Sequence, residues 1–351
     1  MKCLFLVWSS YPSVNMFGDP SVWYRVYQIS DALVKLGMTC HVYHYTDIDD
    51  DFELEQDYDK IIFFRPQYSD QFLKLYNSCQ EITQDLYASY DDLFFDIHQL
   101  RQSEFRCLEA PQKQILSSRP ENYAKAFYFF DKFILSTEPM YDFVKNNFPH
   151  YQAHCQFNAV CPQVLALARN LLPNIKQFRK TRRIGYFAGG KSHENDLARI
   201  SPALTEFLQE NDFEFFCPET LTVPYQISDL GDKLVKTRRL SFFEMFLAYL
   251  KCEINIAPLM INQFTEAKSC IKFLESATFG VKLIGAPITD VKRVANKNFY
   301  PAVDVDEWRT QLKNAEQNQL SEAEVMQSLD YVSENFNTQI EAKRLIKFLD
   351  N

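Results

Sequence analysis

Two neighbouring segments, Ile254-Asn-Ile-Ala-Pro258-Leu259 and Phe264-Thr-Glu-Ala-Lys268-Ser269-Cys-Ile-Lys272-Phe-Leu-Glu275-Ser-Ala-Thr-Phe-Gly280, carry the strongest structural signal in the chain. The first predicts a buried strand. The second predicts a helix that begins at Thr265, whose hydroxyl is a suitable N-cap. Spacings of four and three place Lys268, Lys272 and Glu275 on one predicted helix face. The unit is therefore a strand, a loop and a capped helix.

The same alternation recurs on both sides of this unit. Asp19-Pro20 predicts a helix start and Gly37 its end, and an apolar stripe lies between them at Val22, Val26, Ile29, Leu33 and Leu36. Short apolar strands are predicted at residues 3–8, 40–45, 60–64, 93–97, 132–136, 184–188, 213–216, 253–257 and 281–284. Strands separated by helices predict an α/β protein with parallel sheets.

The pattern divides the chain into two halves. We expect an N-terminal domain at residues 1–165, a linker at 166–183, a C-terminal domain at 184–320, and C-terminal helices at 321–351 that open with a capping box, Ser321 and Glu324. Two open α/β sheets place the carboxyl ends of their strands around a common cleft, where such sheets bind ligands. The sequence therefore predicts an interdomain site.

Composition excludes several classes of protein. The 351 residues carry a formal charge of -9, which argues against a nucleic-acid binder. Nine scattered Cys without a C-x-x-C pair indicate thiols in a reducing cytosol. The first apolar run, residues 3–8, is shorter than a signal peptide or a membrane span requires. We therefore expect a cytoplasmic protein, whose membrane contact, if any, is peripheral.

One segment matches the phosphate loop of ATPases and GTPases. Gly185-Tyr-Phe-Ala-Gly189-Gly190-Lys191-Ser192 has the pattern G-x-x-x-x-G-K-S. However, the apolar run 184–188 places the first glycine inside a strand, whereas the motif requires it after one. Gly189 and Gly190 still allow close approach of a diphosphate, with Lys191 or His193 supplying charge. A tight turn with a solvated lysine is the structural alternative.

The 264–280 segment predicts a second phosphate site. The free amides of its helix start, the Ser269 hydroxyl and Lys268 favour a diphosphate, and Glu275 is placed to accept both ribose hydroxyls of a nucleotide. A surface helix with an ion pair is the alternative. Asp47-Ile-Asp49-Asp50-Asp51 contains D-x-D, a pattern typical of metal clamps, but an acidic run is usually a solvated loop. We expect no essential metal and no cofactor.

Several motifs, in this order, resemble the retaining GT-B glycosyltransferases of bacterial surface-polysaccharide synthesis. Residues 257–280 are similar to their donor-binding helix and residues 185–196 to the loop that opens their C-terminal domain. Upstream, Phe95-Asp-Ile-His98-Gln-Leu100 is similar to their D-x-H-x-L strand end, residues 136–138 to a helix entry, and residues 157–160 to a turn before the linker. Glu266 departs from the family pattern by one position, which puts a catalytic role for it in doubt.

The resemblance implies a fold, an activity and a site. The fold is GT-B, with two Rossmann-like domains facing a central cleft and a C-terminal helix crossing back to the first domain. The donor is a nucleotide-diphosphate sugar and the acceptor a glycan or glycolipid, in lipopolysaccharide- or capsule-type synthesis. The implied location is the cytoplasm, and peripheral association with the cytoplasmic face of the inner membrane is an alternative.

The implied site residues have distinct roles. His98 and Lys268 are the catalytic candidates, and Gly18 and Arg25 lie on the acceptor side, with a plain solvated arginine as the alternative for Arg25. The donor-binding candidates are Gly189, Gly190, Lys191, His193, Pro258, Lys268, Ser269, Lys272 and Glu275. A P-loop nucleotide phosphohydrolase and a GT-B scaffold that binds glycans without turnover remain the alternative functions.

Overall fold

The computed structural model describes residues 1–48, 54, 57–96, 98, 119–188 and 194–350. The chain forms two compact units. The first comprises Met1–Cys161, Ala267–Ser269 and Asn337–Asn351, and the second comprises Pro162–Glu266 and Cys270–Phe336. A linker is predicted at residues 166–183, of which residues 166–178 lie in helical segments of the second unit. The chain passes from one unit to the other earlier, between Cys161 and Pro162.

The first unit contains a six-stranded parallel sheet with the strand order β2-β1-β3-β4-β5-β6. The strands are β1 (Lys2–Val7), β2 (Thr39–His44), β3 (Lys60–Phe64), β4 (Leu86–Tyr90), β5 (Lys132–Leu135) and β6 (Gln152–Cys155). The helical segments are η1 (Ser13–Gly18), α1 (Pro20–Val22), η2 (Trp23–Tyr27), α2 (Gln28–Lys35), η3 (Tyr45–Asp47), α3 (Asp70–Ile82), α6 (Arg119–Phe127), α7 (Glu138–Asn147) and α18 (Thr338–Leu349).

The second unit contains another six-stranded parallel sheet, with the order β12-β11-β10-β7-β8-β9. The strands are β7 (Arg183–Gly185), β8 (Glu214–Pro218), β9 (Leu234–Thr237), β10 (Ile254–Ala257), β11 (Lys282–Gly285) and β12 (Phe299–Pro301). The helical segments are α8 (Pro162–Leu171), η5 (Leu172–Asn174), α9 (Ile175–Phe178), α10 (Glu194–Glu210), α11 (Tyr225–Ser228), η7 (Gly231–Lys233), α12 (Phe242–Leu250), α13 (Gln263–Glu266), α14 (Ile271–Thr278), α15 (Thr289–Val294), α16 (Val305–Gln317) and α17 (Glu322–Asn335).

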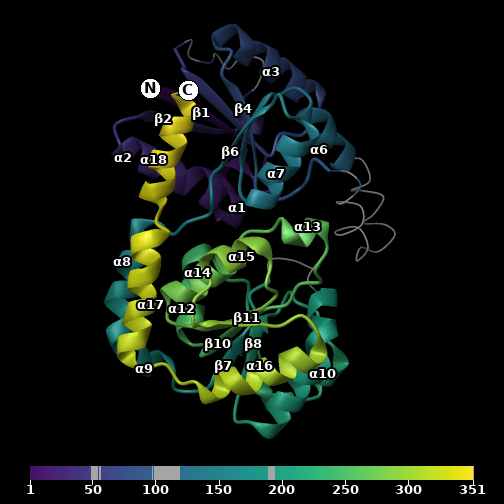
Figure 1. Cartoon of the computed structure of the whole chain (residues 1–351), viewed down its shortest axis with the longest axis vertical. Coiled ribbons are helices and arrows are strands. Elements are labelled where there is room, and N and C mark those ends of the chain that lie inside the picture. The colour runs from purple at the N-terminus through teal and green to yellow at the C-terminus, as the bar shows by residue number, and fades with distance from the viewer. Residues whose placement is uncertain (49–53, 55–56, 97, 99–118, 189–193, 351) are drawn as a thin grey trace. The chain divides into compact units, whose positions relative to one another are not determined.

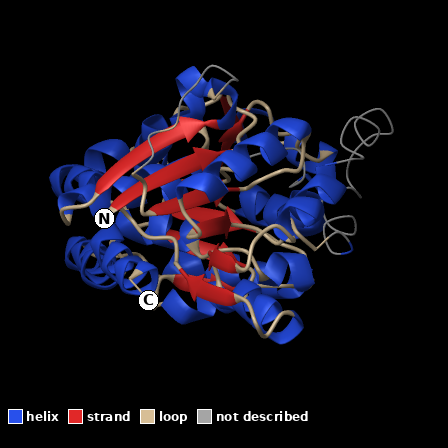
Figure 2. Cartoon of the chain, turned by 90° about the horizontal axis from the view of Figure 1, so that it is seen from above, coloured by secondary structure: helices blue, strands red, loops and turns tan. Residues whose placement is uncertain are grey.

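Helices flank the strands of each sheet, as Figure 2 shows with helices in blue and strands in red. Every strand pair in both sheets is parallel, so the predicted α/β class is confirmed. In the first unit, α18 from the end of the chain lies against α2 (Figure 1). Its apolar side chains Ala342, Leu345 and Leu349 complete the core under β1 and β3. The C-terminal helix therefore returns to the N-terminal sheet.

The predicted first helix is confirmed, with an irregularity. Asp19 caps it, because its carboxylate accepts a hydrogen bond from the Ser21 amide, and Gly37 ends it at φ 91°, a conformation that favours glycine. Between these ends, Trp23–Tyr27 forms a π-helical turn, a feature common at functional sites.

One predicted strand is wrong. Of the predicted strand 93–97, the described residues 93–96 do not form a strand, because β4 of the first sheet is Leu86–Tyr90 and the chain turns after it. Leu93 and Phe95 are nevertheless buried, at 2% and 7% exposure. Since a short apolar run only shows that side chains are buried, it does not distinguish a strand from a packed turn.

Candidate functional site

Three loops follow the carboxyl ends of neighbouring strands in the second sheet, those after β7, β10 and β11. Pro258 directly follows β10 and is buried. Gly285 ends β11, where a Cβ atom would lie 3.0 Å from the Ala257 carbonyl oxygen, so the two strands approach closely there. The predicted donor residues Gly189, Gly190, Lys191 and His193 follow β7 and lie outside the described residues, as does Ser192.

Gly185 has a packing role in this sheet. It lies within β7, and a Cβ atom there would meet the Asn255 side-chain oxygen at 2.5 Å and the Cys252 sulfur at 2.8 Å. A glycine is therefore needed so that β7 can pack against β10. This accounts for the first glycine of the phosphate-loop pattern without a nucleotide.

The single helix predicted after β10, from Thr265 onward, is instead two separate segments, α13 and α14. The single turn α13 starts at Gln263. The side-chain oxygen of the preceding Asn262 accepts the Thr265 amide at 2.9 Å, while Thr265 Oγ1 donates to the Met260 carbonyl at 2.7 Å. Thr265 therefore lies inside α13 and does not cap the longer helix. Because α14 starts only at Ile271, the prediction that Lys268 shares a helix face with Lys272 and Glu275 is wrong.

Hydrogen bonds to other parts of the fold cause this break. The Cys270 amide donates to the Asp290 carboxylate at 2.8 Å, and Asp290, which is 2% exposed, forms an ion pair with Arg293 at 2.7 Å. In the first unit, Thr137 Oγ1 donates to the Ala267 carbonyl at 2.9 Å. These bonds satisfy backbone groups that a continuous helix would pair internally.

Glu266 is used within the second unit. Its carboxylate accepts hydrogen bonds from both the amide and the hydroxyl of Thr289, at 3.0 and 2.9 Å. Thr289 is the first residue of α15, so an anion here stabilises the helix start. The contact assigns Glu266 a structural task, in keeping with the doubt about its catalytic role.

Glu275 is the centre of a buried polar cluster in α14. Its carboxylate is 2% exposed and accepts the Tyr249 hydroxyl at 2.7 Å and the Lys272 ammonium at 3.1 Å. Burial, with the Glu275 charge beside it, raises the pKa of Tyr249 well above its ordinary value, so this hydroxyl is a permanent donor. Lys272 is the accessible member of the cluster, with its side chain 40% exposed.

Lys268 and Ser269 belong to the short segment that lies in the first unit. The Lys268 ammonium is 3.6 Å from the Asp92 carboxylate, in the loop after β4. The Ser269 hydroxyl accepts a hydrogen bond from the Asn158 amide at 2.9 Å. Lys268 and Ser269 thus both have polar partners near the carboxyl ends of the strands in the first sheet.

Arg25 is connected to the same segment through Asn158. Its guanidinium donates to the Asn158 side-chain oxygen at 3.3 Å and to the Gln156 carbonyl oxygen. Arg25 is 2% exposed and lies in the π-helical turn. The solvated alternative for Arg25 is therefore wrong.

The other predicted residues of the first unit, Gly18 and His98, lie outside its strands. Gly18 ends η1, where a Cβ atom would lie 2.9 Å from the Asn15 side-chain oxygen. His98 is exposed, and its amide donates to the Asp96 carboxylate at 3.0 Å. Because β4 ends at Tyr90, His98 does not lie at a strand end as its motif predicts.

Sequence reasoning missed a buried ion pair at the carboxyl edge of the first sheet. Arg65 follows β3 and forms a two-pronged pair with Asp91, which follows β4, at 2.5 and 2.6 Å, and it donates to the Ser21 hydroxyl at 2.8 Å. Although burial alone would raise it, the Arg65 guanidinium holds the pKa of Asp91 below its ordinary value. Arg65 has φ 52°, a strained backbone for a non-glycine residue. The feature of the sequence that could have indicated this pair is the position of Arg65, an arginine directly after a predicted strand.

The described residues form no cluster of three or more His, Cys, Asp or Glu side chains that suits a metal ion. Asp47, from the D-x-D pattern, is exposed and accepts a hydrogen bond from Ser13, while Asp49 to Asp51 lie outside the described residues. Among the described helices, none combines the length and the apolarity that crossing a bilayer requires.

Comparison with known proteins supports the fold. No family model matches the sequence, and no curated protein matches it. A glycosyltransferase from Rickettsia africae ESF-5 has a similar structure, with a TM-score of 0.67, 11% identity, and coverage of 99% of this chain and 97% of the other. The chain has the GT-B fold. Two further GT-B structures are similar over nearly their whole lengths.

One is WaaG, a glycosyltransferase involved in lipopolysaccharide biosynthesis, with a TM-score of 0.57, 14% identity, and coverage of 95% and 94% of the two chains. The other is Anabaena Alr3699/HepE in complex with UDP and glucose, with a TM-score of 0.60, 12% identity, and full coverage of both chains. These GT-B relatives support the resemblance drawn from the motifs.

Proposed function

We propose that this chain is a glycosyltransferase that transfers a sugar from a nucleotide-diphosphate sugar to a glycan or glycolipid acceptor. Bacterial lipopolysaccharide- or capsule-type synthesis is the proposed setting, and the proposed reaction retains the anomeric configuration without a metal. The observation that carries the proposal is the cationic segment around the start of α14, where Lys268 precedes the helix and Lys272 lies in its first turn. The fold shared with glycosyltransferases supports it.

The main electrostatic demand of this reaction is the negative charge that develops on the leaving diphosphate. Lys272 is accessible and oriented by buried Glu275, so it supplies a positioned counter-charge. Lys268 supplies a second one once a diphosphate replaces Asp92 as its partner. Because Glu275 is almost fully buried, its geometry favours an indirect role, in which it holds Lys272 in place.

The first experiment is a thermal-shift screen with UDP-, GDP-, CMP- and ADP-sugars, followed by a transfer assay with the sugar that stabilises. A ligand that binds only the native state raises the melting temperature. We expect one class of nucleotide sugar to stabilise the chain and to be consumed on addition of an acceptor glycan, with and without EDTA. Loss of turnover in EDTA and its recovery with Mn²⁺ would overturn the metal-independent mechanism.

A pair of variants separates this function from the phosphohydrolase alternative. In a phosphate loop the Ser192 hydroxyl ligates Mg²⁺, so Ser192→Ala would abolish ATP hydrolysis. In a glycosyltransferase Ser192→Ala has little effect on the transfer rate, whereas Lys268→Ala lowers that rate strongly. An inactive Ser192→Ala beside an active Lys268→Ala would support the hydrolase. Nucleotide-sugar binding with neither hydrolysis nor transfer would support a scaffold.

A further inference from the structure

A cavity of about 770 Å³ lies in the second unit, at the amino ends of β7, β10 and β11. It is therefore at the opposite end of these strands from the loops that carry the candidate donor residues. Four of its lining side chains are cationic, Lys176, Arg179, Arg182 and Lys282, and two are acidic, Glu253 and Glu322. Its volume falls in the range of small-molecule sites.

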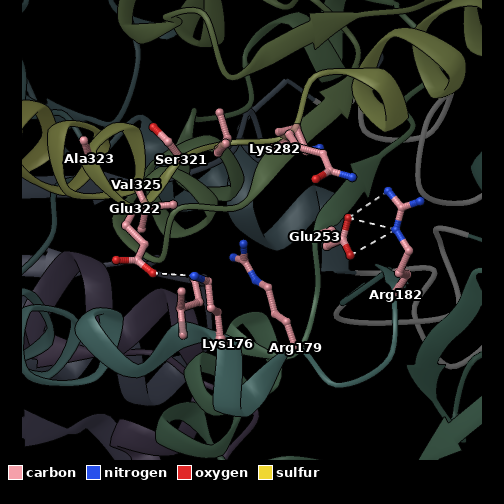
Figure 3. A pocket seen from close by; sticks show the side chains of 12 residues that line it. Lys176, Arg179, Arg182, Glu253, Lys282, Ser321, Glu322, Ala323 and Val325 are labelled. Atoms are coloured by element: carbon pink, nitrogen blue, oxygen red, sulfur yellow. Dashed lines mark hydrogen bonds and ion pairs between the residues drawn. The ribbon is translucent and has the colours of Figure 1, made fainter.

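The register of the parallel strands brings three of these charged residues close together. The Glu253 amide donates to the Arg183 carbonyl at 3.0 Å, and the Lys282 amide donates to the Glu253 carbonyl at 3.2 Å. Arg182, Glu253 and Lys282 therefore stand side by side where three parallel strands begin. Figure 3 shows Arg179 extending between the Lys176–Glu322 pair and the Arg182–Glu253 pair.

Both acidic side chains of the cavity already have cationic partners. Arg182 pairs with Glu253 at 3.1 Å and with Glu316 at 2.9 Å, and Lys176 pairs with Glu322 at 2.8 Å. The Lys176 and Glu322 side chains are 84% and 63% exposed, so solvent weakens that pair. In the part of the chain that the structure describes, these carboxylates therefore form no close ion pair with the other two cations of the cavity, Arg179 and Lys282.

Arg179 and Lys282 have no carboxylate at ion-pair distance among the described residues. Arg179 Nη2 donates to the Gly280 carbonyl at 2.9 Å, whereas its buried Nε has no hydrogen-bond acceptor in the described chain. Lys282 is 3% exposed, and within the described residues its ammonium donates only to the carbonyls of Ala315 and Asn318. At close range these two positive charges are thus met by carbonyl dipoles, while the negative charge of Glu253 acts on both from beyond ion-pair distance.

Burial has a measurable cost for these two groups. It lowers the pKa of Arg179 to about 10 and that of Lys282 to about 8. The Glu253 charge opposes the shift at both residues, whereas the Arg179 and Arg182 charges add to it at Lys282. Carbonyl groups at the ends of α14 and α16 offset part of this cost, as cations favour helix C-termini. A bound anion would offset the remainder, since buried charges are stable when paired.

The first turn of α17 adds to the positive potential. Ser321, Glu322 and Ala323 at its start line the cavity. Ser321 caps the helix by accepting the Glu324 amide, so the predicted capping box is confirmed, and the helix dipole points its positive end here. The backbone amides therefore favour the same kind of ligand as the cationic side chains, while the acidic side chains of this turn, Glu322 and Glu324, are paired with Lys176 and Lys297.

We propose that this cavity binds the phosphate group of a small phosphorylated molecule, with Arg179 and Lys282 as its charged donors. The site is separate from the donor site of the proposed function and does not depend on it. Arg179, with its planar set of N–H groups, suits an oxyanion that accepts more than one hydrogen bond. Lys282 contributes its charge from the floor of the same cavity.

The test uses the full chain, inorganic phosphate as the probe, and NaCl at matched ionic strength as the reference. We expect phosphate to raise the melting temperature more than NaCl does, and to slow hydrogen exchange in peptides covering residues 176–182 and 319–325. Arg179→Gln should weaken phosphate binding at least about tenfold. Arg309→Gln, which removes an exposed arginine of α16, is the matched control and should bind like the wild type.

Lys176→Gln provides a second variant if Arg179→Gln folds poorly, because Lys176 is exposed, and it should weaken binding about two- to fivefold. Repeating the phosphate measurement in saturating UDP shows whether phosphate binds in this cavity or in the donor site of the proposed function. A phosphate effect that persists beside UDP supports the proposal, and one that disappears overturns it. Equal phosphate binding by the wild type and Arg179→Gln, or no effect beyond NaCl, would also overturn it, whatever the transfer assay shows.

Discussion

His154 shows how a single side chain links burial to pH. It lies in β6 and stacks on Phe348 of α18, with ring centroids 5.0 Å apart and planes inclined by 14°. Its buried Nε2 has no hydrogen-bond partner among the described residues. Burial, with the nearby charges of Arg25 and Arg344, lowers the pKa of His154 from 6.5 to about 4. The folded state therefore keeps this imidazole neutral.

The first prediction concerns acid stability. Between about pH 6.5 and pH 4 the unfolded chain binds a proton at residue 154 that the folded chain does not, so the free energy of unfolding falls as the pH is lowered. From pH 7 to pH 5 we expect this group to account for a loss of about 1 to 2 kcal/mol. His154→Phe keeps the stacking and should remove that part of the slope in urea titrations.

His150, which is exposed, provides the control for this prediction. His150→Phe should retain the pH slope of the wild type. Identical slopes for His154→Phe and the wild type would show that His154 does not carry the effect.

The second prediction separates two roles of Glu275. Glu275→Gln removes the charge that holds Lys272 but keeps an oxygen for the Tyr249 hydroxyl, so the fold should survive. We expect nucleotide binding to weaken by about 1.5 to 3 kcal/mol, as for the loss of a hydrogen bond to a charged group. Calorimetry with the nucleotide identified in the screen provides the measurement.

A double-mutant cycle with Lys272→Met gives the discriminating result. If Glu275 acts through Lys272, the double variant should bind no more weakly than Lys272→Met alone. Additive losses would indicate that Glu275 contacts the ribose itself, as the sequence predicts. Unchanged affinity in every variant would remove both residues from the site.

At the scale of elements, the turn between α14 and β11 depends on Gly280. This residue has φ 60°, and a Cβ atom would lie 2.4 Å from Val325 Cγ1 of α17. Gly231, which opens η7, has nearly the same backbone angle, φ 58°, but nothing lies within 4 Å of its Cβ position. The two glycines therefore separate backbone strain from packing.

The third prediction uses this pair. Gly280→Ala should destabilise the second unit by about 2 to 4 kcal/mol, since it adds a clash to an unfavourable backbone conformation. Gly231→Ala should lower the free energy of unfolding only by the cost of the unfavourable backbone conformation, about 1 to 2 kcal/mol. Thermal unfolding of both variants tests the difference, and equal losses would show that α17 moves to accommodate the new methyl group.

At the scale of the whole molecule, the first unit combines residues from both ends of the chain. Leu345 of α18 is fully buried in the same core as Cys3 and Phe5 of β1. Glu341 adds a polar contact, because its carboxylate accepts the Phe157 amide at 3.0 Å. The first unit is therefore incomplete until the last helix of the chain has been synthesised.

The fourth prediction follows from this arrangement. Leu345→Ala should lower the stability of the first unit by about 2 to 5 kcal/mol through the cavity it leaves. Lys343→Ala, at an exposed position of the same helix, should have little effect. Hydrogen exchange in β1 and β2 measures the change, and it should rise in Leu345→Ala alone. Equal exchange in the two variants would mean that α18 is not part of this core.

Local chemistry by itself determined the α/β class, most strand positions, the Asp19 and Ser321 caps and the Gly37 helix end. Each depends on residues close in sequence, through apolar runs and backbone propensity. The GT-B fold was also expected from the resemblance of the ordered motifs to a known family, since that order mirrors the order of the elements.

Only the tertiary structure decided the details of the candidate site. The break before α14 depends on Asp290 and Thr137, the burial of Arg25 depends on Gln156 and Asn158, and the Arg65–Asp91 pair joins two strand ends. The strand predicted at residues 93–97 was wrong because a short apolar run does not distinguish a strand from a packed turn. These features depend on hydrogen bonds and packing between residues far apart in sequence. The spacing of residues along the chain does not predict such distant partners.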